Sequence, residues 1–257
     1  MNILSLEHLT HSYTERKLFD DADFYLHEGD KVGVIGINGT GKSTLLKIMA
    51  GLETPDEGQV IQASNLMIHY LPQNPEFSEE DTVLQSVQNM VHHHANENEL
   101  IAAKAMLTRL GITDFEQKTR ELSGGQRKRL ALVSVLITPC DVLILDEPTN
   151  HLDSEMADWL ENKLQAFRGA LVMVTHDRYF LDLVCNRIVE LDKGKLYYVH
   201  NIVTHTETEE VLVSYQALYP PYGMFVRPLD MFMEEVEDGR EDNITNQKYR
   251  FELYNGK

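Results

Sequence analysis

A phosphate group could be bound by the stretch GINGTGKST, which runs from Gly36 to Thr44. An apolar run at 31–35 precedes it and a run with helical spacing at 44–50 follows it. This is the order of strand, glycine loop and helix that defines a phosphate-binding P-loop. Phosphate oxygens approach the backbone of such a loop closely, so side chains must be absent there, and the helix N-terminus favours an anion. The flanking patterns favour a P-loop over an ordinary glycine turn.

Two side chains of the loop have chemistry of their own. The ammonium group of Lys42 would bridge the β- and γ-phosphates of a nucleotide, and the hydroxyl of Ser43 would hold a magnesium ion. The candidate nucleotide-binding residues of the loop are Gly36, Asn38, Gly39, Thr40, Gly41, Lys42, Ser43 and Thr44.

Two carboxylates, Asp146 and Glu147, end a second apolar run that begins at Asp141. An apolar run of this kind is typical of a central strand in a parallel sheet, and ligands of such sheets bind at the carboxyl ends of the strands. Asp146 is therefore a candidate magnesium ligand, and Glu147 could orient or deprotonate the water that attacks a γ-phosphate. A solvated acidic turn is the alternative, and a P-loop earlier in the chain argues against it.

Two further residues have open interpretations. His176 ends another apolar run, 170–175, where it could contact the γ-phosphate or be a structural histidine. Tyr13 lies upstream of the P-loop, where it could stack on a nucleobase or pack at a sheet edge.

A second anion site is predicted where Ser123, Gly124, Gly125 and Gln126 open a run with helical spacing. Ser123 is a plausible N-cap, and two glycines beside a helix N-terminus suit an anion. The basic triplet 127–129 opposes the helix dipole, and it reads as a solvated face or as a contact for a partner.

Composition and charge narrow the class of protein. The chain has 257 residues, 42% of them hydrophobic, so it can bury a core. Its net charge of −18 argues against broad nucleic-acid binding, and no strongly basic surface is expected. No apolar run reaches membrane-spanning length, and the N-terminus lacks a secretory pattern. Cys140 and Cys185 read as reduced thiols, so we expect a cytoplasmic protein with no membrane segment of its own.

The expected elements alternate between strands and helices, which indicates an α/β fold. A run of three histidines, 92–94, is expected at a solvated helix end, because consecutive side chains on a helix diverge and cannot chelate one metal together. The predicted strands are 3–10, 18–26, 31–35, a hairpin arm from 59 that leads into a strand at 66–71, 141–147, 170–175 and a hairpin from 188 onward. The predicted helices are 44–50, 81–94, 99–110, 127–137 and 155–167.

These motifs, taken in order, resemble those of the ABC ATPases. The P-loop, Gln73, the stretch 122–126, Asp146-Glu147 and His176 are similar to the Walker A, Q-loop, signature, Walker B and H-loop elements of that family. The resemblance covers Met1 to about Lys195. The stretches PTNHLD at 148–153 and THDRYFLD at 175–182 resemble the ABC-F branch, which is associated with ribosomes and translation.

The resemblance implies a fold, a reaction and roles for residues. It implies a P-loop ABC ATPase domain with antiparallel β and helical subdomains, binding ATP and Mg²⁺. Tyr13 would stack on adenine, Gln73 would sense magnesium and water, and His176 would position the γ-phosphate. Ser123 and Gly125 would contact the γ-phosphate held by a second subunit, so turnover would need a head-to-tail homodimer or another ABC half. Asp153 would lie at the dimer seam.

The resemblance implies ATP chemistry more strongly than it implies a biological role. ABC-F proteins usually carry two ABC halves and a helical linker, whereas this sequence has one half and no linker. A ribosomal partner is therefore implied more weakly than ATP chemistry. Two alternatives stay open: an ATPase subunit of a transporter, and a truncated or fused module that binds nucleotide without turnover.

The segment after Lys195 resembles a family of small bacterial β-rich proteins of unknown function, notably at 215–219 and 226–232. Paired strands are expected at 196–203 and 210–215, a loose polar stretch at 238–246 and a last strand at 249–253. We therefore predict an ABC-type domain at 1–195 and a small mainly-β domain at 196–257. The two would be fused through the short stretch Gly194-Lys195-Leu196-Tyr197-Tyr198, which suits both families.

Overall fold

A computed structural model describes residues 1–13, 16–90, 97–192 and 195–233. The predictions for the histidine run 92–94, the polar stretch 238–246 and the last strand 249–253 lie outside these residues.

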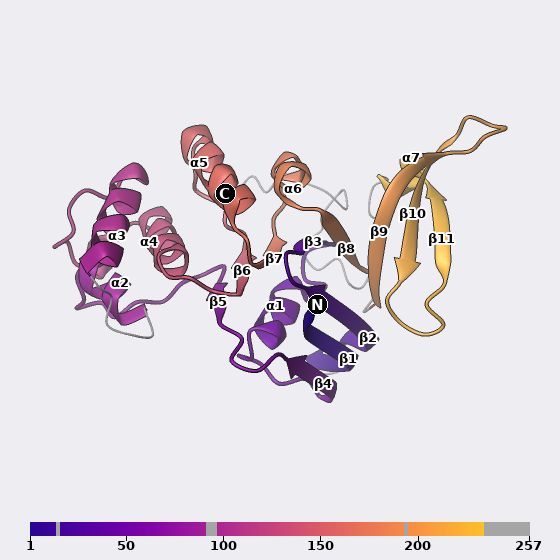
Figure 1. The fold of residues 1–257 in the computed structure, drawn as a ribbon, viewed down its shortest axis with the longest axis horizontal. Helices are drawn as coiled ribbons and strands as arrows, with labels where there is room; N and C mark the ends of the chain where they lie inside the picture. Colours follow the sequence, from indigo (N-terminus) through magenta and orange to yellow (C-terminus); the bar gives the residue numbers. More distant parts are fainter. Residues whose placement is uncertain (14–15, 91–96, 193–194, 234–257) are drawn as a thin grey trace.

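The largest element of the described chain is an eight-stranded sheet with the order β11-β10-β9-β8-β3-β7-β6-β5 (Figure 1). The five strands from β8 to β5 run parallel to their neighbours, and β9, β10 and β11 continue the sheet as antiparallel strands. The bounds are β3 Lys31–Ile35, β5 Ile68–Leu71, β6 Val142–Asp146, β7 Ala170–Val174, β8 Arg187–Asp192, β9 Lys195–Thr204, β10 Val211–Ala217 and β11 Met224–Pro228.

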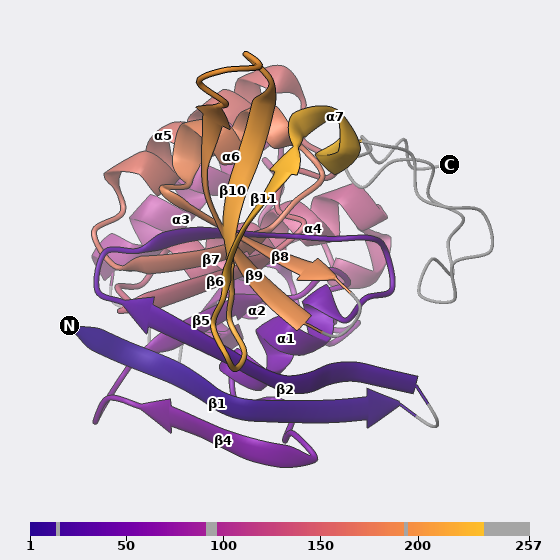
Figure 2. The same cartoon turned by 90° about the vertical axis from the view of Figure 1, so that its right-hand side faces the viewer.

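A second, antiparallel sheet of three strands has the order β2-β1-β4 and forms a separate layer (Figure 2). Its strands are β1 Asn2–Tyr13, β2 Arg16–His27 and β4 Glu57–Gln62. Helix α1, Lys42–Met49, joins this layer to the large sheet. Apolar side chains of α1 share one buried cluster with Leu6 and Phe24 of the small sheet and with Val34 and Ile144 of the large one. Burial of this continuous apolar surface holds the P-loop helix between two sheets.

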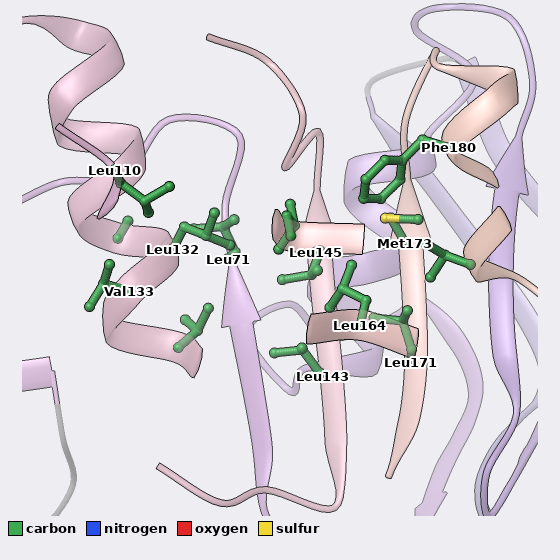
Figure 3. Packing of buried hydrophobic residues seen from close by; sticks show 14 of the residues in the cluster. Leu71, Leu110, Leu132, Val133, Leu143, Leu145, Leu164, Leu171, Met173 and Phe180 are labelled. Atoms are coloured by element: carbon green, nitrogen blue, oxygen red, sulfur yellow. The ribbon is translucent and has the colours of Figure 1, made fainter. Parts of the chain in front are cut away.

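The remaining helices pack at the other face of the large sheet or beside its β5 edge. Leu145, Met173 and Phe180 are buried together between β6, β7 and α6 (Figure 3). Helices α2, α3 and α4 cluster beyond β5 (Figure 1). The bounds are α2 Val83–Met90, α3 Glu97–Arg109, η1 Thr119–Glu121, α4 Gly124–Leu136, α5 Ser154–Ala166, α6 Arg178–Val184 and α7 Leu229–Phe232.

The predicted elements that fall within the described residues have counterparts in this architecture, and the structure adds elements that were not predicted, among them η1, α6 and α7. The seven-residue helix α6 follows His176 directly and was not predicted, because it is too short to show a helical period. The short helix α7 was not predicted either, since its four residues are too few to show a helical period. The expected α/β class, the antiparallel and helical subdomains and the β-rich C-terminal region are all present.

The C-terminal strands continue the large sheet rather than forming a sheet of their own. Strand β9 pairs with β8 from Ile188–Val199 to Asp192–Lys195, across the expected domain boundary. The turn after β10 also docks on β2, since Asp23 N donates to Leu218 O at 2.7 Å and the Tyr222 hydroxyl donates to the Asp23 carboxylate. The two parts therefore share one sheet and are also joined by these two hydrogen bonds at Asp23.

Candidate functional site

The glycine loop joins β3 to α1 in a conformation that the sequence requires. Gly36 has φ 148°, and a Cβ there would lie 2.4 Å from the carbonyl oxygen of Leu191 in β8. Gly41 has φ 106° and is the N-cap of α1. Both positions exclude other residues, because left-handed backbone and the close contact penalise a side chain. The loop amides and the first turn of α1 lie where the sequence predicts an anion site.

Lys42 is buried at the start of α1 and points back over the loop. Its Nζ donates to the carbonyl oxygens of Gly36 at 2.8 Å and Ile37 at 3.0 Å. Burial lowers the pKa of Lys42 to about 8, and the nearby carboxylates of Glu147 and Asp146 act in the opposite direction. An anion in the loop would take the place of these carbonyl partners and would favour the ammonium form.

The two carboxylates at the end of β6 are almost completely buried, with 1% exposure for Asp146 and 4% for Glu147. Burial raises the pKa of Asp146, and a hydrogen bond from Ser43 opposes that rise. Burial and the adjacent Asp146 raise the pKa of Glu147 to about 7. Asp146 Oδ2 and Glu147 Oε2 have no hydrogen-bond partner. Buried polar oxygens are rarely left in this state, so both are disposed toward a ligand.

His176 faces Glu147 from the end of β7, with its Nε2 3.2 Å from Glu147 Oε1. Burial, and to a smaller extent Lys42, lowers the pKa of His176 to about 4, so the ring is neutral near pH 7. Glu147 has the unusual φ of 53°, and its N–H donates to Val174 O at 2.8 Å. Thr149 and Thr175 join the loops after β6 and β7 through their hydroxyls at 2.8 Å. These contacts fix the two side chains relative to each other.

A cavity of about 580 Å³ brings most of the predicted residues together. Gly36 and Thr40 belong to the loop but do not line this cavity; the Thr40 hydroxyl closes the loop by donating to Ile37 O at 2.8 Å. The predicted residues that line the cavity are Tyr13, Asn38, Gly39, Gly41, Lys42, Ser43, Thr44, Gln73, Asp146, Glu147 and His176.

Three more lining residues, Leu18, Asn150 and Val174, were not predicted. Asn150 belongs to the stretch 148–153 that the sequence had already singled out, so its position after the carboxylates was the available signal. Leu18 and Val174 are apolar strand residues, which the sequence alone cannot distinguish from core.

Tyr13 ends β1 and borders the cavity with 50% of its surface exposed. The ring is therefore half-exposed beside the cavity, and both interpretations of Tyr13 stay open on this observation.

The predicted second anion site lies away from this cavity. Ser123 is the N-cap of α4, and Gln126 N donates to Ser123 Oγ at 3.3 Å while Ser123 N donates to Gln126 Oε1 at 2.9 Å. Ser123 and Gly124 are exposed, and a Cβ on Gly125 would lie 3.3 Å from His151. None of the residues 123–126 lines the cavity that contains Lys42.

The basic triplet after this cap is not the solvated face that the sequence suggested as its simplest explanation. Lys128 is 8% exposed, and burial lowers its pKa while Glu147 and Asp146 oppose the shift. Its charge is therefore removed from solvent and is stabilised by the two carboxylates at the end of β6. Burial of one member of the triplet depends on how α4 packs, which a sequence pattern of three cations does not reveal.

The two cysteines are free, as expected. Burial raises the pKa of both thiols to about 12, so neither is reactive at neutral pH. Among the described residues, no group of three or more His, Cys, Asp and Glu side chains could hold a metal ion by itself. No helix of the described chain is long and apolar enough to cross a membrane.

Comparison with protein families decides the classification. The family described as ABC transporter matches residues 19–150, just over half of the chain, and includes the P-loop and both carboxylates. The chain belongs to the ABC transporter family. A second family, described as a protein of unknown function (DUF1653), matches residues 193–253. The division agrees with the resemblances read from the sequence.

Curated relatives of this ABC protein extend beyond the matched region. It is 41% identical over 234 residues to the uncharacterized ABC transporter ATP-binding protein YfmR of Bacillus subtilis, covering 77% of this chain and 37% of the relative. It is 36% identical over 219 residues to the energy-dependent translational throttle protein EttA of Escherichia coli K12, covering 70% of this chain and 40% of the relative. The chain thus spans about two fifths of the length of these relatives.

Solved structures support the same fold. An ATP-binding subunit of an ABC transporter has a TM-score of 0.67 at 22% identity, covering 75% of this chain and 87% of that chain. A dimeric ATP-binding cassette bound to ADP and Pi has a TM-score of 0.65 at 24% identity, covering 75% of this chain and 95% of that chain. The ABC ATPase fold is therefore common to this chain and its structural neighbours.

Proposed function

We propose that this chain binds ATP with Mg²⁺ in the cavity above the P-loop and hydrolyses it. The observation that carries the proposal is that Lys42 lines one cavity together with two buried carboxylates, each of which has an oxygen without a hydrogen-bond partner. The Lys42 ammonium can neutralise charge on the γ-phosphate of a polyphosphate. The carboxylates can supply the oxygen ligands that a divalent ion requires. Membership of the ABC transporter family adds independent support.

The residues at the site fit a magnesium ion. Mg²⁺ prefers hard oxygen ligands and is bound by one or two carboxylates together with substrate phosphates. The hydroxyl of Ser43, the carboxylate of Asp146 and the side-chain amide oxygen of Gln73 would supply such ligands, and all three side chains line the cavity. The bound ion would neutralise charge that develops on the β- and γ-phosphates.

The protein's own residues would act by positioning and by proton transfer. Lys42 would leave its loop carbonyl partners and pair with the β- and γ-phosphate oxygens, while Asn38 and the loop amides hold the rest of the triphosphate. Glu147 would accept a hydrogen bond from the attacking water at its free Oε2 atom and take its proton. Neutral His176, 3.2 Å from Glu147 Oε1, would orient that carboxylate and contact the γ-phosphate.

The absence of residues 123–126 from the cavity supports a composite site. We propose that Ser123, Gly124, Gly125 and Gln126 of a second ABC half, in a homodimer or from another chain, cover the γ-phosphate held here. Their capped helix N-terminus carries amides that suit an anion. A dimeric cassette is among the structural neighbours, which supports a dimer, and the head-to-tail arrangement comes from the resemblance to ABC ATPases.

For the biological role, we propose a translation-related protein of the ABC-F type. The stretch 148–153 and the relatedness to a translational throttle protein support this assignment. The resemblance of the first 195 residues to ABC-F proteins, which are cytoplasmic, also favours a ribosomal partner over a transporter. Residues 1–195 would be the ATPase domain and 196–257 a β-rich domain of separate ancestry.

Turnover and binding can be separated in one experiment. Phosphate release and ATP binding are measured for the full chain and for Lys42→Ala and Glu147→Gln. We expect Lys42→Ala to lose binding and Glu147→Gln to bind ATP but to release phosphate at least about a hundredfold more slowly. Binding by the full chain with no Glu147-dependent turnover would instead mean a nucleotide-binding module.

A further inference from the structure

The ring of Tyr13 is held by side chains that lie outside the nucleotide cavity. Its hydroxyl donates to Glu53 Oε1 and also bonds to the side chain of Thr44. Glu53 does not line the cavity, so it is not placed to contact a base itself. Thr44 lies in the first turn of α1, and Glu53 lies in the connector that follows this helix. The hydroxyl is thus tied to both ends of the P-loop helix.

His11 supports this arrangement from beneath. Its side chain is only 7% exposed, and its Nε2 lies 2.9 Å from the same Glu53 Oε1 atom. The His11 ring meets Tyr13 edge-on, with centroids 5.2 Å apart and planes at 79°. On its other side it stacks against Phe19 at 6.5 Å. Tyr13 therefore packs against a buried ring as well as bonding through its hydroxyl.

Asp56 closes the network from the same connector. Its Oδ1 lies 3.6 Å from His11 Nδ1, its Oδ2 accepts from Ser12 N at 2.7 Å, and its backbone N donates to Thr10 O at 3.0 Å. The carboxylates of Glu53 and Asp56, both in the connector after α1, thus contact the last residues of β1. The hydroxyl of a half-exposed tyrosine could be satisfied by water alone. We therefore interpret these side-chain contacts as fixing the orientation of the Tyr13 ring.

We propose that Glu53 and His11 are positioning residues that hold the Tyr13 ring ready to stack on the base of a nucleotide. This inference rests on the proposed ATP site. An unrestrained tyrosine would lose side-chain freedom when a base stacked on it, and holding the ring in place beforehand removes part of that cost. The restraint comes from α1, its connector and His11 of β1, so it links the base platform to the helix that follows the phosphate loop.

The proposal distinguishes nucleotides from bare polyphosphate. Stacking accepts any base, since each has a π-face, and Glu53 offers no edge contact to select one. Loss of Glu53 should therefore weaken the binding of every nucleoside triphosphate but not the binding of inorganic tripolyphosphate. A simple change of charge would behave in the opposite way, because removal of a carboxylate would strengthen binding of both anions.

The test is a double-mutant cycle on the full chain, with Mg-ATP and Mg-tripolyphosphate as ligands in equilibrium titrations. The variants are Glu53→Ala, Tyr13→Ala, Tyr13→Phe and the double variant Glu53→Ala/Tyr13→Ala. Glu57→Ala is the matched control, since Glu57 is an exposed acid near Glu53 in sequence that opens β4. Thermal unfolding of each variant accompanies the titrations.

We expect Tyr13→Ala to lower the affinity for ATP by about tenfold. We expect Glu53→Ala to lower it by about threefold. Tripolyphosphate affinity should stay within about twofold in both variants, as it does for Glu57→Ala. Tyr13→Phe keeps the ring but loses the restraint, so it should match Glu53→Ala. In the Tyr13→Ala background, Glu53→Ala should cause no further loss.

Additive losses, or equal losses for ATP and tripolyphosphate, would overturn the proposal. If Glu53→Ala failed to fold, Tyr13→Phe would carry the same test, and unchanged ATP affinity in that variant would also overturn it. Failure of the ATP site itself looks different: the unaltered chain would then bind neither ligand in a Lys42-dependent manner.

Discussion

At the scale of single residues, the site consists of ionisable side chains whose charged forms are disfavoured by burial. Glu147 is 4% exposed and lies beside Asp146, which is why its pKa rises to about 7. Lys42 and His176 are shifted in the opposite direction by the same burial. Groups whose protonation is poised in this way are common where proton transfer is needed. Sequence reasoning had named all three residues as candidates, because their motifs are local, and the structure places them in one cavity, but the burial of Lys128 could not be foreseen.

A pH-dependent stability follows from Glu147. Its folded-state pKa is raised above the usual 4.5, so between about pH 4.5 and 7 the folded state binds more protons than the unfolded state, and stability falls as pH rises. Glu147→Gln should therefore raise the free energy of unfolding by about 1–3 kcal/mol near pH 8, and by much less near pH 5. Urea unfolding at both pH values measures this, with exposed Glu28→Gln as the control. An equal effect at both pH values would contradict it.

At the scale of elements, each functional residue sits at the end of a strand or the start of a helix. The P-loop, the carboxylate pair and His176 follow β3, β6 and β7, three neighbouring parallel strands. Their apolar runs and the glycine spacing made these elements predictable. Helix α6 was not, since a seven-residue helix after His176 depends on packing of Phe180 and Leu181 rather than on a visible period.

The capping box of α4 gives a prediction at this scale. Ser123→Ala removes the hydroxyl that accepts from Gln126 N, and it should lower the free energy of unfolding by about 1 kcal/mol. Ser123→Thr should keep the cap and most of the stability. Urea unfolding of the two variants makes the comparison. Equal stabilities of Ser123→Ala and the unaltered chain would show that water satisfies the helix end as well as the side chain does.

At the scale of the whole molecule, two families of sequence share one sheet. The boundary near Lys195 was taken from the two family resemblances, but the pairing of β9 with β8 and the Asp23 contact to the C-terminal turn are long-range. Nothing in a linear pattern reveals which sheet edge a later strand will join. The predicted division therefore describes sequence families better than it describes separate cores, since Leu196 and Leu218 belong to the same buried cluster as α1.

A shared core predicts shared unfolding. Calorimetry of the full chain should give one transition that includes the β-rich region, because β9 would lose its partner if the ATPase part melted. Tyr222→Phe, which removes the hydroxyl bound to buried Asp23, should lower the free energy of unfolding by about 1–3 kcal/mol and shift that whole transition. A separate, earlier transition confined to the β-rich region would contradict this account.

The central claim is that one chain supplies half of a composite ATP site, with Lys42 in one copy facing Ser123 of another. The most direct measurement is ATP-dependent self-association of Glu147→Gln by light scattering, with Lys42→Ala as the control that cannot bind nucleotide. The account predicts that ATP doubles the mass of Glu147→Gln and leaves Lys42→Ala monomeric. A Glu147→Gln protein that binds ATP yet stays monomeric at all concentrations would contradict a homodimeric site, and would require a different chain to supply the second half.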